Sequence, residues 1–251
     1  MSLIEVSGLN KYFPSVEKGK YFQAVKDVSF KLEEGEFLGL VGESGCGKST
    51  IAKILVGLIP DDGGEIFIDG EQRRYPYPRS VYREIQMIFQ MPKDSFDPKK
   101  TVKQAMRRVQ KNFGMSGNLD ERSIELLNRV SLDETYLKKY PHQMSGGECQ
   151  RVAIARALAA NPKIILCDEI TSSLDVSVQA QIIDLLLTLK ESGEISTIFI
   201  SHDLALVQQV CDRVLVMKEG SIVEEGIPAQ VLNHPEHPFT QQLVSSIFSV
   251  D

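Results

Sequence analysis

The chain has no tryptophan, no long hydrophobic run and no excess of positive charge. No stretch reaches the roughly 18 uncharged apolar residues that a membrane-spanning helix needs. Glu5, Ser7 and Asn10 interrupt the apolar positions of the N-terminal stretch, so we expect no signal peptide. Lys and Arg number 28 against 34 Asp and Glu. The resulting net charge of −6 argues against a nucleic-acid partner bound by phosphate neutralisation.

Cysteine is also scarce. The four cysteines lie far apart and show no metal-ligand spacing: Cys46, Cys149, Cys167 and Cys211. This usage predicts a reduced, cytoplasmic setting. The 251 residues are 42% hydrophobic and 25% charged, which excludes a disordered chain and leaves enough apolar material for a core.

The N-terminal third has the alternating pattern of β-strands. The expected strands are 3–6, 24–30, 37–41, 65–69 and 85–89. Residues 49–58 have the pattern of a helix, which Pro60 and the turn at 61–64 should close.

The rest of the chain is richer in helical patterns. Residues 101–113 and 120–130 carry apolar residues at i, i+3 and i+4, which predicts two helices. Helices and strands then alternate over 145–159 (helix), 164–167 (strand), 176–190 (helix) and 195–200 (strand). This rhythm is typical of βαβ units, so we expect an α/β fold with a parallel sheet. A strand pair at 213–218 and 221–225 and a short helical tail complete it.

One glycine-rich stretch matches the phosphate-binding loop G-x-x-x-x-G-K-[ST] between a predicted strand and a predicted helix. Its residues are the expected nucleotide ligands: Gly42, Glu43, Ser44, Gly45, Cys46, Gly47, Lys48, Ser49 and Thr50. Glycines let backbone N–H groups converge on phosphate oxygens, and the helix start adds its positive dipole end. Lys48 should reach the β- and γ-phosphates, and the Ser49 hydroxyl should ligate Mg²⁺.

A second predicted strand ends in two carboxylates, Asp168 and Glu169. Beside a phosphate loop, Asp168 can hold the Mg²⁺ shell, and Glu169 can orient and deprotonate a water. The alternative is a solvated acidic strand end without catalytic function.

Between these two motifs lies Ser145-Gly146-Gly147-Glu148, which resembles the L-S-G-G-Q signature of ATP-binding cassette (ABC) ATPases. Three further landmarks of that family follow their expected order: Gln90 for the Q-loop, Asp175 in the D-loop, and His202 as the switch histidine. The resemblance covers essentially the whole chain. It implies a single nucleotide-binding domain over 1–251, with an N-terminal antiparallel β region. The RecA-like P-loop core would comprise about 1–95 and 161–251, and a helical subdomain bearing the signature about 96–160.

The resemblance also assigns roles to residues. Lys48, Gln90, Glu169 and His202 would form the catalytic set, with Gln90 also reaching the Mg²⁺. The residues that would close over the nucleotide of a partner cassette are Ser145, Gly146, Gly147, Glu148 and Asp175. Phe13 resembles the aromatic residue that stacks on adenine. Tyr12, Tyr21 and Phe22 remain candidates for the same role.

Two segments resemble those of importers for oligopeptides, dipeptides and nickel: the Q-loop region at 86–102 and the tail at 224–240. Such an importer implies a second ATPase subunit (a copy of this chain or a homologue), two permeases and an extracellular binding protein. The expected location is the cytoplasmic face of a prokaryotic membrane. Peptide, nickel and metal chelate stay open as cargo. The alternatives are a non-transport ABC ATPase and, further away, a P-loop kinase.

The chain departs from the family pattern at three positions near these motifs. Met144 replaces a leucine of similar volume, and Ile170 replaces a proline, which leaves the rigidity of that turn open. Glu148 replaces glutamine. Together with Ser145 it predicts a capping box, and its carboxylate is expected to repel the ATP across the interface.

Two further expectations concern single residue types. We expect the Cys46 thiol to be accessible to alkylating reagents and shielded by ATP. Two histidines of the tail, His234 and His237, lie among prolines, and we interpret them as part of the tail motif rather than as a metal site. The chain ends at Asp251 without the cysteine-containing extension of some relatives, so we expect no iron–sulfur cluster.

Overall fold

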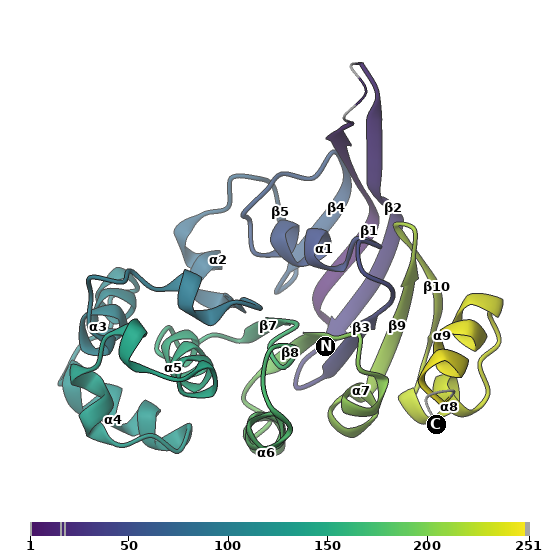
Figure 1. Ribbon diagram of the computed structural model, residues 1–251. Coiled ribbons are helices and arrows are strands. Elements are labelled where there is room, and N and C mark those ends of the chain that lie inside the picture. Colours follow the sequence, from purple (N-terminus) through teal and green to yellow (C-terminus); the bar gives the residue numbers. More distant parts are fainter. Residues whose placement is uncertain (1, 16, 18, 249–251) are drawn as a thin grey trace. The chain divides into compact units, whose positions relative to one another are not determined.

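The computed structural model describes residues 2–15, 17 and 19–248. The chain divides into two compact units. The first comprises Met1–Tyr82 and Ser196–Asp251, and the second comprises Arg83–Ile195. Figure 1 shows the elements of both units along the sequence.

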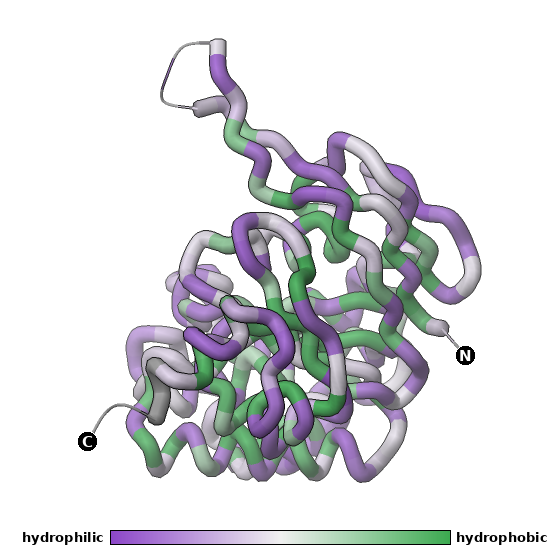
Figure 2. The backbone as a smooth tube through the Cα atoms, turned by 90° about the vertical axis from the view of Figure 1, so that its right-hand side faces the viewer, coloured by the Kyte–Doolittle hydropathy of each residue, from purple (hydrophilic) through white to green (hydrophobic). Residues whose placement is uncertain are grey.

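The first unit contains an antiparallel sheet in the order β2-β1-β4-β5. Its strands are β1 (Ser2–Pro14), β2 (Tyr21–Glu33), β4 (Gly63–Ile68) and β5 (Glu71–Arg73). Val6 of β1 lies opposite Phe30 of β2 on one side and Ile66 of β4 on the other, and all three side chains are buried. The alternation of hydrophobic and hydrophilic residues along these strands is visible in Figure 2. The expected N-terminal antiparallel region is confirmed.

The first unit also contains parallel strands. In its centre, β3 (Phe37–Val41) runs between β8 (Ser196–Ile200) and β9 (Arg213–Lys218) and is parallel to both. All residues of β3 and β8 are buried, as expected for strands covered on both faces. β10 (Ser221–Gly226) pairs antiparallel with β9. The helices that follow β3 and β8 are α1 (Lys48–Leu55) and α7 (Leu204–Val210).

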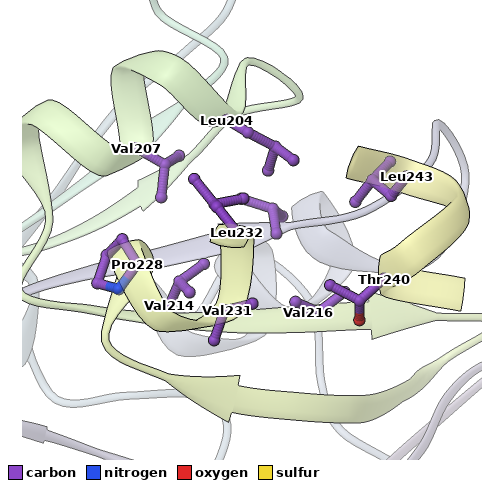
Figure 3. A pocket seen from close by; sticks show the side chains of 10 residues that line it. Leu204, Val207, Val214, Val216, Pro228, Val231, Leu232, Thr240 and Leu243 are labelled. Carbon is purple, nitrogen blue, oxygen red and sulfur yellow. The ribbon is translucent and has the colours of Figure 1, made fainter. Parts of the chain in front are cut away.

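Two C-terminal helices, α8 (Pro228–Asn233) and α9 (Pro238–Phe248), pack near β9 and α7. Figure 3 shows the apolar side chains that meet there. They come from α7, β9, α8 and α9: Leu204, Val207, Val214, Val216, Val231, Leu232 and Leu243. This contact buries the helical tail that the sequence predicts.

A glutamate of β10 fixes the turn that leads into α9. The Glu224 carboxylate accepts the backbone N–H of Glu236 and that of His237, both at 3.0 Å. His237 Nδ1 in turn accepts the N–H of Phe239 at 3.1 Å, and Phe239 is buried. The tail motif therefore has a structural role. In the part of the chain that the structure describes, no cluster of His, Cys, Asp and Glu could hold a metal ion.

We predict that Glu224→Gln lowers the free energy of unfolding by about 1–2 kcal/mol at pH 7, because hydrogen bonds to a charged acceptor are replaced. Burial alone would raise the pKa of Glu224, but the hydrogen bonds that the carboxylate accepts outweigh burial and hold it below its usual range. The contribution is therefore full above the ordinary pKa of a glutamate and is lost as the pH falls through the depressed one.

Urea unfolding at pH 7 and at acid pH checks this dependence. The control is Glu236→Gln, since the Glu236 side chain is exposed. A difference between wild type and Glu224→Gln that stays constant across the acid range would contradict this role of the Glu224 carboxylate.

The second unit combines two parallel strands with four helices of two turns or more among its described residues. β6 (Ile85–Ile88) pairs with β7 (Ile164–Asp168). The helices are α3 (Val102–Asn112), α4 (Leu119–Arg129), α5 (Gly146–Leu158) and α6 (Val176–Glu191). Arg107 of α3 makes two hydrogen bonds of 2.7 Å to Asp120 of α4. This bidentate pair joins the two helices that the sequence predicts.

Among the strands and α-helices of the described residues, the sequence patterns missed three short ones, namely β5, α2 (Arg79–Glu84) and α7. Each has seven residues or fewer, which is too short for a period to be recognised. The first predicted helix ends at Leu55 rather than at residue 58. Gly57 has φ +68° there, a backbone conformation that terminates helices. The expected helical segment 96–160 belongs to the second unit together with β6, β7 and α6. Its boundary with a RecA-like core stays a prediction.

None of the helices in the described part of the chain is both long enough and apolar enough to cross a membrane.

Candidate nucleotide-binding site

The phosphate-binding loop connects β3 to α1 and passes very close to other backbone segments. A Cβ on Gly42 (φ +150°) would lie 2.1 Å from the carbonyl oxygen of Met217, at the end of β9. A Cβ on Gly47 (φ +113°) would lie 2.4 Å from the carbonyl oxygen of Ala24 in β2. Both positions therefore require glycine for space and for backbone conformation.

The N-terminus of α1 points into this loop. Gly47 is the N-cap, and its carbonyl accepts the N–H groups of Thr50 and Ile51 at 3.0 Å. Gly47 has no side chain that could cap this end, and a helix N-terminus of this kind is suited to bind an anion. Lys48 is 4% exposed, and its ammonium donates to the carbonyls of Gly42 (2.8 Å) and Glu43 (2.9 Å). A fixed positive charge thus lies inside the loop.

Cys46 is a residue of the loop and is buried, so the prediction of an accessible thiol is wrong. The residue is 7% exposed, and its sulfur lies 3.7 Å from the Lys48 ammonium. Its carbonyl accepts the Gly220 N–H at 2.9 Å, which ties this part of the loop to the turn between β9 and β10. No sequence pattern predicts this contact, because Gly220 is 174 positions away.

His202 follows β8, the strand next to β3. Leu40 of β3 pairs with Ile200 of β8, and the Ser201 N–H donates to the Leu40 carbonyl at 3.3 Å. The phosphate loop and the exposed His202 therefore leave neighbouring parallel strands at the same edge of the first unit. Ligands of open α/β sheets bind at this edge.

Phe13 lies near the end of β1, half-buried, and pairs with Phe22 of β2. The Lys11 ammonium is 5.6 Å from the centre of the Phe13 ring. Tyr12, Tyr21 and Phe22 are all more exposed than Phe13. The adenine-stacking role of Phe13 stays a prediction, and the other three aromatics stay candidates.

The second unit holds the predicted carboxylates and Q-loop residue. Asp168 is the last residue of β7 and is 7% exposed. The Gln90 amide nitrogen donates to Glu169 Oε2 at 3.0 Å and to the Ser172 hydroxyl at 3.2 Å. The structure therefore brings Gln90 and Glu169 together, as the resemblance implies.

The turn after Glu169 is well fixed although it lacks proline. Glu169 has φ +49°, and its carbonyl accepts the Ser172 hydroxyl at 2.9 Å. Ile170 is 1% exposed, and the Thr171 carbonyl accepts the Gln179 side chain at 2.9 Å. Burial of the isoleucine and these hydrogen bonds replace the rigidity that a proline would supply.

The signature segment begins α5 with the predicted capping box. The Ser145 hydroxyl accepts the Glu148 N–H at 3.2 Å, and Glu148 Oε2 accepts the Ser145 N–H at 2.7 Å. A Cβ on Gly147 would lie 2.3 Å from a methyl group of Val178 in α6, so only glycine fits. Gly146 occupies the first helical position. Asp175 caps α6 by accepting the Val178 N–H at 3.0 Å.

Two residues that the sequence did not single out contact Glu148. The Tyr136 hydroxyl donates to Glu148 Oε1, and the Lys139 ammonium lies 3.7 Å from the same oxygen. The hydrogen bond from Tyr136 is the largest of the effects that lower the pKa of Glu148 to about 2. Neither residue belongs to a spaced motif, so no sequence pattern could have found them.

The predicted residues thus fall into two groups. The phosphate loop, Phe13 and His202 belong to the first unit, whereas Gln90, the signature, Asp168, Glu169 and Asp175 belong to the second. A glycine-rich loop between a parallel strand and a helix N-terminus, in an α/β chain, defines a P-loop nucleotide-binding protein.

Comparison with known proteins narrows this class. The profile of the ABC transporter family matches residues 25–172. The chain is 43% identical to the oligopeptide transport ATP-binding protein OppF of Haemophilus influenzae, over 92% of this chain and 71% of that protein. It is also 43% identical to the glutathione import ATP-binding protein GsiA of Pectobacterium atrosepticum, with 98% of this chain covered but only 41% of GsiA.

A solved structure agrees with these relatives. The dimeric ATP-binding cassette MJ0796 in a post-hydrolysis state, bound to ADP and Pi, superimposes with a TM-score of 0.78 at 31% identity, covering 90% of this chain and 98% of that chain. The chain belongs to the ABC transporter family. It is an ABC ATPase. The comparisons confirm both the resemblance and the α/β P-loop fold.

We predict that Gly47→Ala abolishes ATP binding and lowers the free energy of unfolding by more than about 3 kcal/mol, because the new Cβ meets the Ala24 carbonyl at a strained φ. Gly114→Ala is the matched control, since Gly114 has φ +71° with nothing within 4 Å of a Cβ. It should cost only the backbone strain of about 1–2 kcal/mol. Equal losses in both variants, measured by urea unfolding and nucleotide titration, would count against the close approach.

Proposed function

We propose that this chain is the ATP-hydrolysing subunit of an importer for peptides. Membership of the ABC transporter family supports the ATPase function, and the named functions of OppF and GsiA support peptides as cargo. Nickel and metal chelates, which the resemblance also allows, stay predictions. The single observation that carries the proposal is the phosphate loop with the buried Lys48 at its centre.

In this proposal the phosphate loop, Gly42 to Thr50, holds the β- and γ-phosphates through backbone N–H groups and Lys48. Phe13 stacks on the adenine. Three oxygen donors suit Mg²⁺, namely the Ser49 hydroxyl, the Asp168 carboxylate and the Gln90 amide oxygen. The hydrogen bonds of Gln90 agree with this role. Its amide nitrogen donates to Glu169 and Ser172, so the amide oxygen is the atom that would meet the cation. Bound Mg²⁺ would neutralise charge on the phosphates.

Glu169 is the proposed general base. Gln90 holds one of its carboxylate oxygens at 3.0 Å, which gives the carboxylate a defined direction for taking a proton from water. His202 is proposed to contact the γ-phosphate and the attacking water from the first unit. Lys48 stabilises the charge that develops on the phosphates.

A second cassette completes the site. We propose that the signature of one chain closes over the nucleotide of the other, with Ser145, Gly146 and Gly147 contributing the anion-binding helix end. Glu148 belongs to the first turn of the same helix, and Asp175 caps α6. The partner is a copy of this chain or a homologous subunit, in line with the dimer recorded for MJ0796. A phosphate that bridges two chains makes dimerisation depend on ATP.

The remaining partners are two transmembrane permeases, which this chain would meet at the cytoplasmic face of the membrane, and, indirectly, an extracellular binding protein. The two alternatives make different predictions. A non-transport ABC ATPase should purify without permeases. A P-loop kinase should turn over ATP as a monomer in the presence of an acceptor.

We predict that Glu169→Gln binds ATP but hydrolyses it about 10²–10⁴-fold more slowly, because the amide cannot accept a proton. ATP should then accumulate a dimer that ADP does not produce. Light scattering and a phosphate-release assay measure the two effects in the full chain and in the assembled complex. The control is Glu191→Gln, at the exposed end of α6. Hydrolysis near the wild-type rate in Glu169→Gln would remove this residue from the catalytic role.

The cargo has its own test. A strain of the source organism in which Glu169→Gln replaces the wild-type chain should lose uptake of labelled oligopeptides. Uptake of a labelled free amino acid, which uses other transport systems, should stay unchanged. Labelled nickel is the second substrate to be measured. Loss of nickel uptake with normal peptide uptake would contradict the peptide assignment and would leave the ATPase assignment intact.

A further inference from the structure

Glu148 carries a negative charge in the first turn of the signature helix, where an ATP phosphate of the partner cassette has to approach. Like charges at such a place repel each other, and the repulsion is strongest where water is excluded. A glutamate in this position therefore requires some compensation if the helix end is to bind an anion.

The second unit contains that compensation. Both Glu148 oxygens are engaged: Oε2 accepts the Ser145 N–H at 2.7 Å, and Oε1 accepts the Tyr136 hydroxyl. The Lys139 ammonium lies 3.7 Å from Oε1 and 3.5 Å from the centre of the Tyr136 ring. One cation and one hydroxyl thus face the carboxylate from the segment that precedes α5. The Glu148 side chain is 25% exposed and that of Lys139 32%.

We propose that Tyr136 and Lys139 are positioning residues that hold the Glu148 carboxylate against its own chain and cancel its charge, so that the Ser145 helix end can bind the γ-phosphate of ATP on the partner cassette. We call Tyr136, Lys139 and Glu148 the signature clamp. This inference rests on the proposed function, in which two cassettes share each nucleotide.

The clamp has a second effect on the same helix end. Because Glu148 Oε2 holds the Ser145 N–H, the orientation of the Ser145 backbone follows the orientation of the carboxylate. Tyr136 fixes the other oxygen of that carboxylate and thereby the direction in which the Ser145 hydroxyl lies. The sequence alone predicts that the Glu148 carboxylate repels ATP. In the proposed arrangement the clamp matches the charge of this carboxylate locally, so the repulsion is offset.

The first experiment measures the pKa of the Glu148 carboxyl by carbon-13 NMR in the full chain. The clamp predicts a pKa near 2 in the wild type, and the hydrogen bond from Tyr136 is its largest cause. Tyr136→Phe should raise the pKa by about one unit or more. Tyr140→Phe, in the same segment, is the control and should leave it unchanged. An ordinary pKa in the wild type, or no change in Tyr136→Phe, overturns the clamp.

The second experiment measures ATP-driven association by light scattering in the full chain carrying Glu169→Gln. An uncompensated surface charge typically changes binding about threefold at one site. A dimer has two sites, so Tyr136→Phe or Lys139→Gln should weaken association about tenfold in total. Lys138→Gln is the matched control, because it removes the same charge from the neighbouring, exposed residue. The loss should grow smaller at high salt.

Adding Glu148→Gln separates charge compensation from a purely structural role. With that carboxylate neutral, Tyr136→Phe and Lys139→Gln should change association less than about twofold. Losses of the same size with and without Glu148→Gln would overturn the proposal. If Glu169→Gln produces no ATP-driven association either in the full chain alone or in the assembled complex, the proposed function fails, and the NMR pKa still decides whether the clamp exists.

Discussion

The close approach of the phosphate loop to two carbonyl groups is the constraint on which the first unit depends. The Met217 carbonyl at the end of β9 and the Ala24 carbonyl in β2 leave room only for glycine at positions 42 and 47. The turn between β9 and β10 takes part as well, because Gly220 donates to the Cys46 carbonyl and accepts the Lys26 N–H. The conformation of the loop therefore depends on its packing against both sheets of this unit.

The second unit uses the same device with different chemistry. Glycine is again required by a close approach, here that of Gly147 to Val178. The two helix ends differ in their charge. The end at Gly47 has no side-chain cap and has the Lys48 ammonium in the adjoining loop, whereas the end at Ser145 carries a capping box with the Glu148 carboxylate. An anion site that contains a carboxylate needs a neighbouring cation and donor, and Lys139 and Tyr136 provide them.

Sequence reasoning predicted what depends on spacing along the chain. The phosphate loop, the strand that ends in Asp168 and Glu169, the capping box of Ser145 and most long helices follow local rules, and the structure contains them. It did not predict what depends on contacts between distant residues. The burial of Cys46 requires Gly220, the order of the turn after Glu169 requires the packing of Ile170, and the fixing of α9 requires Glu224. Tyr136 and Lys139 lie only a few residues before the signature but belong to no spaced motif, so only the folded chain shows that they contact Glu148.

The central claim is that each nucleotide lies between the phosphate loop of one cassette and the signature of another, and mixing two inactive variants tests it most directly. Lys48→Ala disables the loop, and Ser145→Arg disables the signature. Each variant alone should show no ATP turnover. In a mixed dimer the intact loop of one chain meets the intact signature of the other, so one complete site forms. The account predicts that the mixture regains turnover. A mixture that stays as inactive as its components, under conditions in which the wild-type chain alone turns over ATP, would contradict it.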